Sequence, residues 1–99
     1  MQNIICRITL EVLGRPQEHV DETMGKVVEK IKTEENLKVR NVKRHESKVM
    51  ERNGKFYTTF TELEFETNQL KRVLEICYDY MPSNVEIVEP AGLEMDCND

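Results

Sequence analysis

The sequence has few of the residues that build metal sites or disulfide frameworks. Its 99 residues include three cysteines and two histidines. The cysteines form no Cys-X-X-Cys pair, a spacing common in structural zinc sites, and their odd number disfavours a disulfide framework. Whether Cys6 and Cys77 pair stays open, and the acidic neighbours of Cys97 suppress its thiolate. We expect no bound metal and no cofactor.

Long apolar runs are also missing. No stretch approaches the roughly 18–20 residues that a membrane span needs, and the first residues show no export signal. The length is that of one domain. We therefore expect a cytoplasmic protein with no membrane partner, built as a single domain over residues 1–90 and followed by an acidic tail over 91–99.

The first half of the chain changes its hydrophobic period once. Apolar residues alternate with polar ones over residues 4–13, which predicts a strand with one buried face. Gly14 ends that strand, and Pro16 suits the first turn of a helix. The apolar spacing from Val20 to Ile31 then predicts an amphipathic helix that ends near Glu35.

An Asn-Gly pair at residues 53–54 gives the strongest local signal, because it favours a two-residue hairpin turn. It predicts strands over residues 37–49 and 56–67. Asn68 is the expected N-cap of a second helix. Five apolar residues form the stripe that we expect this helix to bury: Leu70, Val73, Leu74, Cys77 and Met81. After Pro82, residues 85–88 predict a last strand.

The order β-α-β-β-α-β predicts an α+β fold of the ferredoxin-like type. In this two-layer sandwich, two helices cover one face of a four-stranded antiparallel sheet. The other face would carry Phe56 and Phe60 beside glutamates and would favour a partner. RNA binding is disfavoured, because those glutamates repel phosphate.

Charge is unevenly distributed along the chain. Residues 1–37 carry a net −2, residues 38–55 a net +5 and residues 56–99 a net −8. The basic block predicts either contact with the acidic surface of a second copy or simple protection of an edge strand. We name Phe56, Phe60, Arg40 and Arg44 as the expected interface of a homo-oligomer.

The turn after the first strand is a candidate anion site. Gly14 and Arg15 precede a helix start, where free amides and the helix dipole favour negative charge. A turn glycine followed by a first-turn proline explains the same residues without a ligand. The stretch "LEVLGRPQEHV" resembles the ligand-binding turn of ACT-like regulatory domains, with Arg15-Pro16 matching and Gly14 and Gln17 differing.

A second resemblance points to chemistry. The chain is similar in element order to acylphosphatases, which use an arginine after the first strand and an asparagine on the second. Arg15 and Asn41, within "KVRN", would be the counterparts, whereas the glycine-rich cradle of that family is missing. The expected function is a small, non-enzymatic, ACT-like binding or regulatory module that self-associates and takes a small anion at Gly14 and Arg15. An acylphosphatase-like hydrolase is the alternative, and an RNA-binding domain is the third reading.

Overall fold

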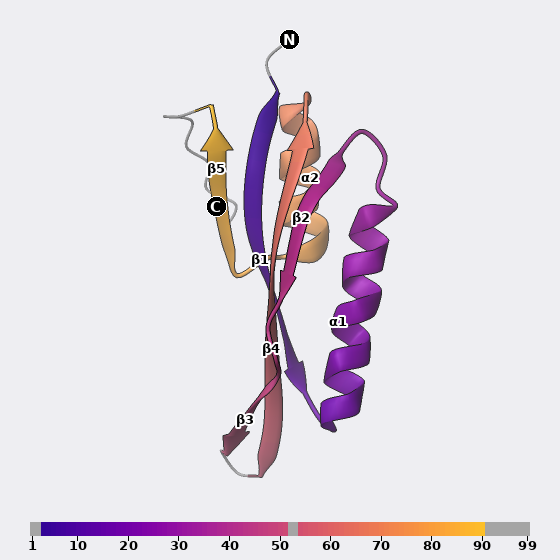
Figure 1. Cartoon of the computed structure of the whole chain (residues 1–99), viewed down its shortest axis with the longest axis vertical. Helices are drawn as coiled ribbons and strands as arrows, with labels where there is room; N and C mark the ends of the chain where they lie inside the picture. The colour runs from indigo at the N-terminus through magenta and orange to yellow at the C-terminus, as the bar shows by residue number, and fades with distance from the viewer. Residues whose placement is uncertain (1–2, 52–53, 91–99) are drawn as a thin grey trace.

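The structure, a computed structural model, describes residues 3–51 and 54–90. Within those ranges the chain forms two helices and five strands (Figure 1). In chain order these are β1 (Ile4–Gly14), α1 (Gln17–Lys32), β2 (Lys38–Arg44), β3 (Lys48–Glu51), β4 (Lys55–Thr67), α2 (Leu70–Tyr80) and β5 (Asn84–Glu89). The turn residues Arg52 and Asn53, the acidic tail and Cys97 lie outside the described residues.

All strand pairs are antiparallel, and the order across the sheet is β2-β4-β1-β5, with β3 also pairing with β4. The predicted α+β fold with two helices and an antiparallel sheet is therefore confirmed. The described part of the sheet has five strands where the sequence predicted four. The difference comes from residues 37–49, which form two strands instead of one.

The second predicted strand contains two irregularities, and the one at residues 45–47 divides it. Arg44 lies opposite Thr61 and Lys48 lies opposite Thr58. Three residues therefore separate Arg44 from Lys48, whereas two residues separate Thr58 from Thr61. A similar shift occurs at Arg40. An extra residue in one strand bends it and interrupts the ladder. The break at residues 45–47 is held by α1, because Gln17 Nε2 donates a 2.7 Å hydrogen bond to Ser47 Oγ.

Both helices pack on the same face of the sheet. The even-numbered residues of β1 and the odd-numbered residues of β4 lie on that face, as their register shows. Together with the inward residues of α1 and α2 they form one core: Ile4, Cys6, Ile8, Leu10, Met24, Val28, Ile31, Leu63, Phe65, Val73, Ile76 and Cys77. The opposite side, which we call the helix-free face, carries Phe56 and Phe60 partly exposed.

The helix ends predicted from the sequence lie slightly beyond those in the structure. Pro16 precedes the first helical residue of α1 instead of occupying it, and Gln69, not Asn68, caps α2. The first helix ends at Lys32 because Thr33 turns back, donating from its amide and its hydroxyl to the carbonyl of Lys30. Asn36, with φ of 62°, then redirects the chain toward β2.

The buried side of α2 differs from the predicted one. Val73 and Cys77 are buried as expected, but Ile76 is fully buried, whereas Leu70 and Leu74 are exposed and Met81 is 82% exposed. The helix is rotated so that its inward face centres on Ile76 and includes Arg72, whose side chain is 13% exposed. The sequence thus contains two apolar stripes on α2, the predicted one with Leu74 and the observed one with Ile76. The hydrogen-bond partners of Arg72 favour the orientation that buries Ile76.

None of the helices in the two described ranges combines the length and the apolar character that a membrane span requires.

Candidate functional site

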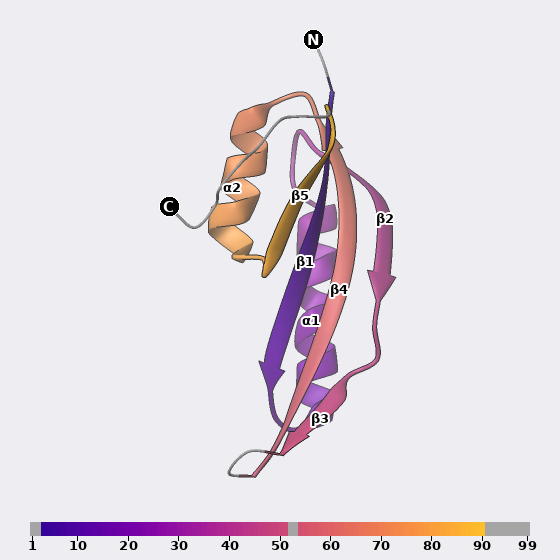
Figure 2. The same ribbon diagram turned by 90° about the vertical axis from the view of Figure 1, so that its left-hand side faces the viewer.

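Two exposed apolar side chains of the sheet, Leu13 and Met50, lie where β3 and β4 meet the end of β1. Leu13 lies opposite Thr58, so its diagonal neighbours on the helix-free face are Phe56 and Phe60. Met50 of β3 lies directly opposite Phe56. Leu13 is 61% exposed and Met50 39%. Figures 1 and 2 show the β3–β4 hairpin extending past the first turn of α1. Because these side chains lie on the helix-free face, no described helix covers them.

Arg15 joins this group. Its guanidinium carbon lies 5.1 Å from the centre of the Phe56 ring, within the range of a cation–π contact. Gly54 also lies next to the guanidinium, because a Cβ added there would be 3.5 Å from Arg15 Nη1. Gly54 also has φ of 122°, a conformation that favours glycine. We call Leu13, Arg15, Met50, Phe56 and Phe60 the hairpin-end patch.

The structure therefore brings together two predictions that the sequence kept apart. Arg15 was expected at an anion site and Phe56 at an interface, yet the two side chains are in contact. At the start of α1, the amides of His19 and Val20 both donate to the carbonyl of Pro16. Gly14 makes room for Val20, whose Cγ2 would lie 3.6 Å from an added Cβ. The Arg15 guanidinium thus lies over the Phe56 ring and close to Gly54.

The two arginines predicted at the interface lie elsewhere. Arg40 is exposed at the bulge of β2, on the free edge of the sheet. Arg44 lies on the helix side, where its Nη2 donates a 3.0 Å hydrogen bond to the carbonyl of Asp21. Neither arginine belongs to the hairpin-end patch.

Arg15 and Asn41 do not share a site. Asn41 lies opposite Glu64 of β4, whereas Gly14, next to Arg15, lies opposite Tyr57. Seven residues of an extended strand correspond to roughly 23 Å. Asn41 instead borders a small hollow of about 170 Å³ that also involves Arg7, Lys43, Glu62, Leu63 and Glu64. A single small phosphate ester cannot contact both residues at that separation.

Charged side chains cross the helix-free face in rows. Arg7 of β1 lies between Glu64 of β4 and Glu86 of β5, with a nitrogen 3.4 Å from an oxygen of each. His45 Nε2 is 3.8 Å from Glu62. Within the described residues, no group of three or more His, Cys, Asp or Glu side chains is placed to hold a metal ion.

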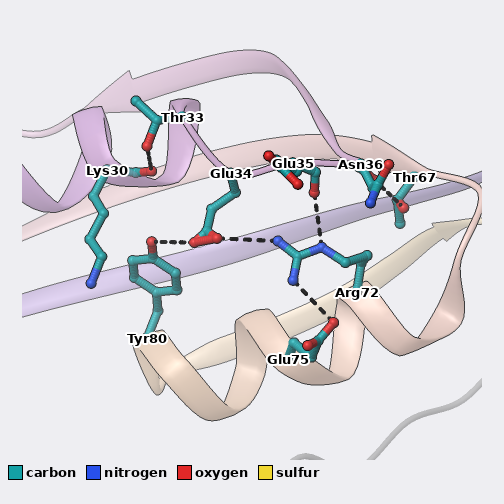
Figure 3. A network of polar contacts seen from close by, with 9 residues as sticks. All are labelled: Lys30, Thr33, Glu34, Glu35, Asn36, Thr67, Arg72, Glu75 and Tyr80. Carbon is teal, nitrogen blue, oxygen red and sulfur yellow. Dashed lines mark hydrogen bonds and ion pairs between the residues drawn. The ribbon is translucent and has the colours of Figure 1, made fainter.

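A polar cluster that the sequence analysis did not identify lies around α2 (Figure 3), at the end of the molecule opposite the β3–β4 hairpin (Figure 1). Arg72 of α2 uses three nitrogens at once: Nε donates to the carbonyl of Glu35 at 3.0 Å, Nη1 to Glu75 at 3.0 Å and Nη2 to Glu34 at 3.2 Å. Its hydrogen bond to Glu75 raises the pKa of the guanidinium, which stays charged. We call Glu34, Arg72, Glu75 and Tyr80 the α2 clamp.

Tyr80 completes the clamp. Its hydroxyl donates a 3.1 Å hydrogen bond to Glu34, and Lys30 Nζ lies 5.7 Å from the ring centre. Burial, followed by the hydrogen bond to Glu34, raises the pKa of the Tyr80 phenol to about 12. The neighbouring Thr67 hydroxyl donates to the carbonyl of Asn36 at 2.7 Å. These groups bind each other, so the clamp fastens the α1–β2 connection to α2.

A signal for the clamp exists in the sequence but is weak. Arg72 and Glu75 are three residues apart on one helix, a spacing that allows an ion pair. Glu34, however, is 38 residues from Arg72, and no local pattern links them.

Comparison with known proteins adds one finding. The model of the MJ0538 family, a description that names no substrate or activity, matches residues 5–99. No curated protein and no solved structure matches the chain.

Proposed function

The chain belongs to the MJ0538 family, and within it we propose that the protein is a small binding module that acts by associating with a second copy of itself, not by catalysis. The observation that carries this proposal is the hairpin-end patch. It combines two aromatic rings, a methionine, a leucine and an arginine on a face that no described helix covers. Aromatic residues, methionine and arginine are the residues enriched at protein interfaces.

The fold supports this reading. When β2 and β3 are counted as one interrupted strand, the order β2-β4-β1-β5 is that of a ferredoxin-like sandwich. Such a sheet has helices on one face only, so association through the other face is a simple way to cover Leu13 and Phe56. This is also the basis on which we propose an ACT-like binding role.

The position of Arg15 favours a protein surface over a small anion. The guanidinium lies over the Phe56 ring, and contact with an aromatic face is one that arginine often makes at interfaces. A planar cation held on a ring can bind a carbonyl or carboxylate of the partner. We therefore assign Arg15 to the interface.

The test is the mass of the protein in solution at about 1 M salt, where charge contacts are screened to about 3 Å. We expect a concentration-dependent dimer, measured by sedimentation equilibrium. Leu13→Glu should raise the dissociation constant at least about tenfold, which corresponds to about 1.4 kcal/mol. Leu74→Glu is the matched control, because Leu74 is exposed on α2, away from the patch.

Three outcomes would overturn the proposal. They are a wild-type protein that stays monomeric at every concentration, equal effects of Leu13→Glu and Leu74→Glu, and turnover of an acyl phosphate that Arg15→Ala abolishes. The last result would support the hydrolase instead. Binding of single-stranded RNA at low salt would support the third reading, against the repulsion expected from Glu62, Glu64 and Glu66.

A further inference from the structure

The two edges of the sheet differ in charge, and we propose that copies of the chain also join head to tail through them, β2 of one copy pairing with β5 of the next. This contact uses surfaces other than the hairpin-end patch, so it goes beyond the function proposed above. Among the described residues, β2 pairs only with β4 and β5 only with β1. Both edges therefore present one free row of backbone donors and acceptors.

Strand direction permits this contact. Each strand in the order β2-β4-β1-β5 is antiparallel to its neighbour, so β5 runs opposite to β2. A second copy placed in the plane of the sheet continues the antiparallel alternation and keeps its helices on the same side. The strands match in length, with seven residues in β2 and six in β5, or roughly 20 Å of ladder.

Charge supports this pairing on the helix-free face. Lys38 and Lys43 of β2 lie opposite Glu66 and Glu62 of β4, and Arg40 is exposed at the bulge. At the other edge, Glu86 and Glu89 of β5 are exposed. Acidic and basic side chains already alternate across neighbouring strands of the sheet, where Arg7 joins Glu64 to Glu86. An acidic β5 beside the basic β2 of another copy continues that alternation, and opposite charges on facing strands are stabilising.

The helix side of the two edges also matches. Val39 and Val42 of β2 lie opposite Phe65 and Leu63, and both are only half-buried in the single chain. Ile87 of β5 lies opposite Cys6 and is likewise half-buried. A register that sets Ile87 opposite Val42 also sets Glu86 opposite Lys43, because side chains alternate between faces along a strand. Both faces are complementary in that register.

The symmetric alternatives are less favourable. Two copies of β2 would set lysine and arginine against lysine and arginine, and two copies of β5 would set glutamate against glutamate. Like charges on directly facing strands destabilise a pair. Only the head-to-tail contact matches opposite charges, and such a contact generates a closed ring or an open chain of copies.

The experiment uses two charge-reversed variants of the full chain, measured by light scattering after size exclusion at low salt. One carries Arg40→Glu with Lys43→Glu, and the other carries Glu86→Lys with Glu89→Lys. Each alone should lose the low-salt species larger than a dimer, with association through the edges weakened at least about tenfold. An equimolar mixture should restore these species, because the acidic β2 of one variant meets the basic β5 of the other. Wild-type assembly should shrink at about 1 M salt.

The controls distinguish a loss of folding from a loss of edge pairing. Circular dichroism and thermal unfolding establish that each variant folds, and Glu89→Lys alone, which keeps the ion pair of Glu86 with Arg7, should give a smaller loss. Species larger than a dimer formed by the Glu86→Lys, Glu89→Lys variant alone would overturn the inference, as would a mixture that does not recover them. A salt-resistant dimer that Leu13→Glu abolishes would still support the proposed function on its own.

Discussion

The two ends of the molecule use arginine in different ways. At the end that carries α2, Arg72 binds two carboxylates and a carbonyl and is 13% exposed, so its hydrogen-bonding capacity is used within the fold. At the hairpin end, Arg15 lies on a ring beside exposed Leu13 and Met50. The first arrangement contributes to the stability of the fold, whereas the second leaves apolar side chains exposed to solvent. Figure 2 shows α2 and the β3–β4 hairpin at opposite ends of the molecule.

The largest effect on stability should come from Arg72→Ala. The substitution leaves Glu34, Glu75 and the carbonyl of Glu35 without their shared donor. Because these partners are partly exposed, we expect the free energy of unfolding to fall by about 2 kcal/mol. Urea denaturation measures the change. Lys71→Ala, one residue earlier and exposed, should have little effect, and an equal loss from both variants would contradict the distinction between the two ends.

A smaller effect tests whether the hairpin end is locally constrained. Gly54→Ala places a side chain at φ of 122° and should destabilise the fold by about 1 kcal/mol. Gly25→Ala is the control, because Gly25 lies inside α1 with ordinary contact distances and alanine favours helices. We expect opposite signs in thermal unfolding. Stabilisation by both substitutions would show that the turn has no such constraint.

The clamp also predicts a pH dependence. The pKa of Tyr80 is raised from 10.0 to about 12 in the fold, so the protonated phenol is the stabilised form. The contribution of the protonated Tyr80 phenol to the free energy of unfolding is complete below pH 10 and is lost as the pH rises from 10 through about 12. Tyr80→Phe should cost about 1 kcal/mol at neutral pH and flatten this decline.

The control for that titration is Tyr78→Phe, because Tyr78 is 84% exposed on the same helix. Melting temperatures measured across the alkaline range should decline alike for Tyr78→Phe and the wild type. An unchanged decline in Tyr80→Phe would show that the phenol is not the titrating group.

The smallest effect on stability should follow Arg15→Gln. Loss of an exposed stacking contact should change the free energy of unfolding by about 0.5 kcal/mol or less. The same variant should weaken dimerisation at high salt. A loss of stability as large as that of Arg72→Ala would remove the contrast between the two arginines.

Much of the fold could be predicted from local pattern. The alternation of apolar and polar residues predicted β1, and the helical period predicted α1 and α2. The Asn-Gly pair predicted the boundary between β3 and β4. The break in the second strand could not be predicted, because it is a shift in register against β4 that local pattern does not encode. The hydrogen bond that accompanies the break joins Gln17 and Ser47, which are 30 residues apart.

The sites show the same limit. Phe56 and Arg15 were both identified as candidates, but their contact depends on the hairpin folding back onto the end of β1. The prediction of which side of α2 is buried was wrong, because Leu74 fits the helical period as well as Ile76 does. A distant carboxylate, Glu34, favours the orientation that buries Ile76.

The bulge at Arg40 has a consequence for how the chain avoids misassembly. A regular strand can slide along a neighbour by two residues and still pair, so a plain edge accepts many alignments. An irregular edge accepts few, because a shifted neighbour meets the extra residue where it needs a straight ladder. The kink at Arg40 thus limits the alignments that β2 can accept and makes indiscriminate stacking less favourable.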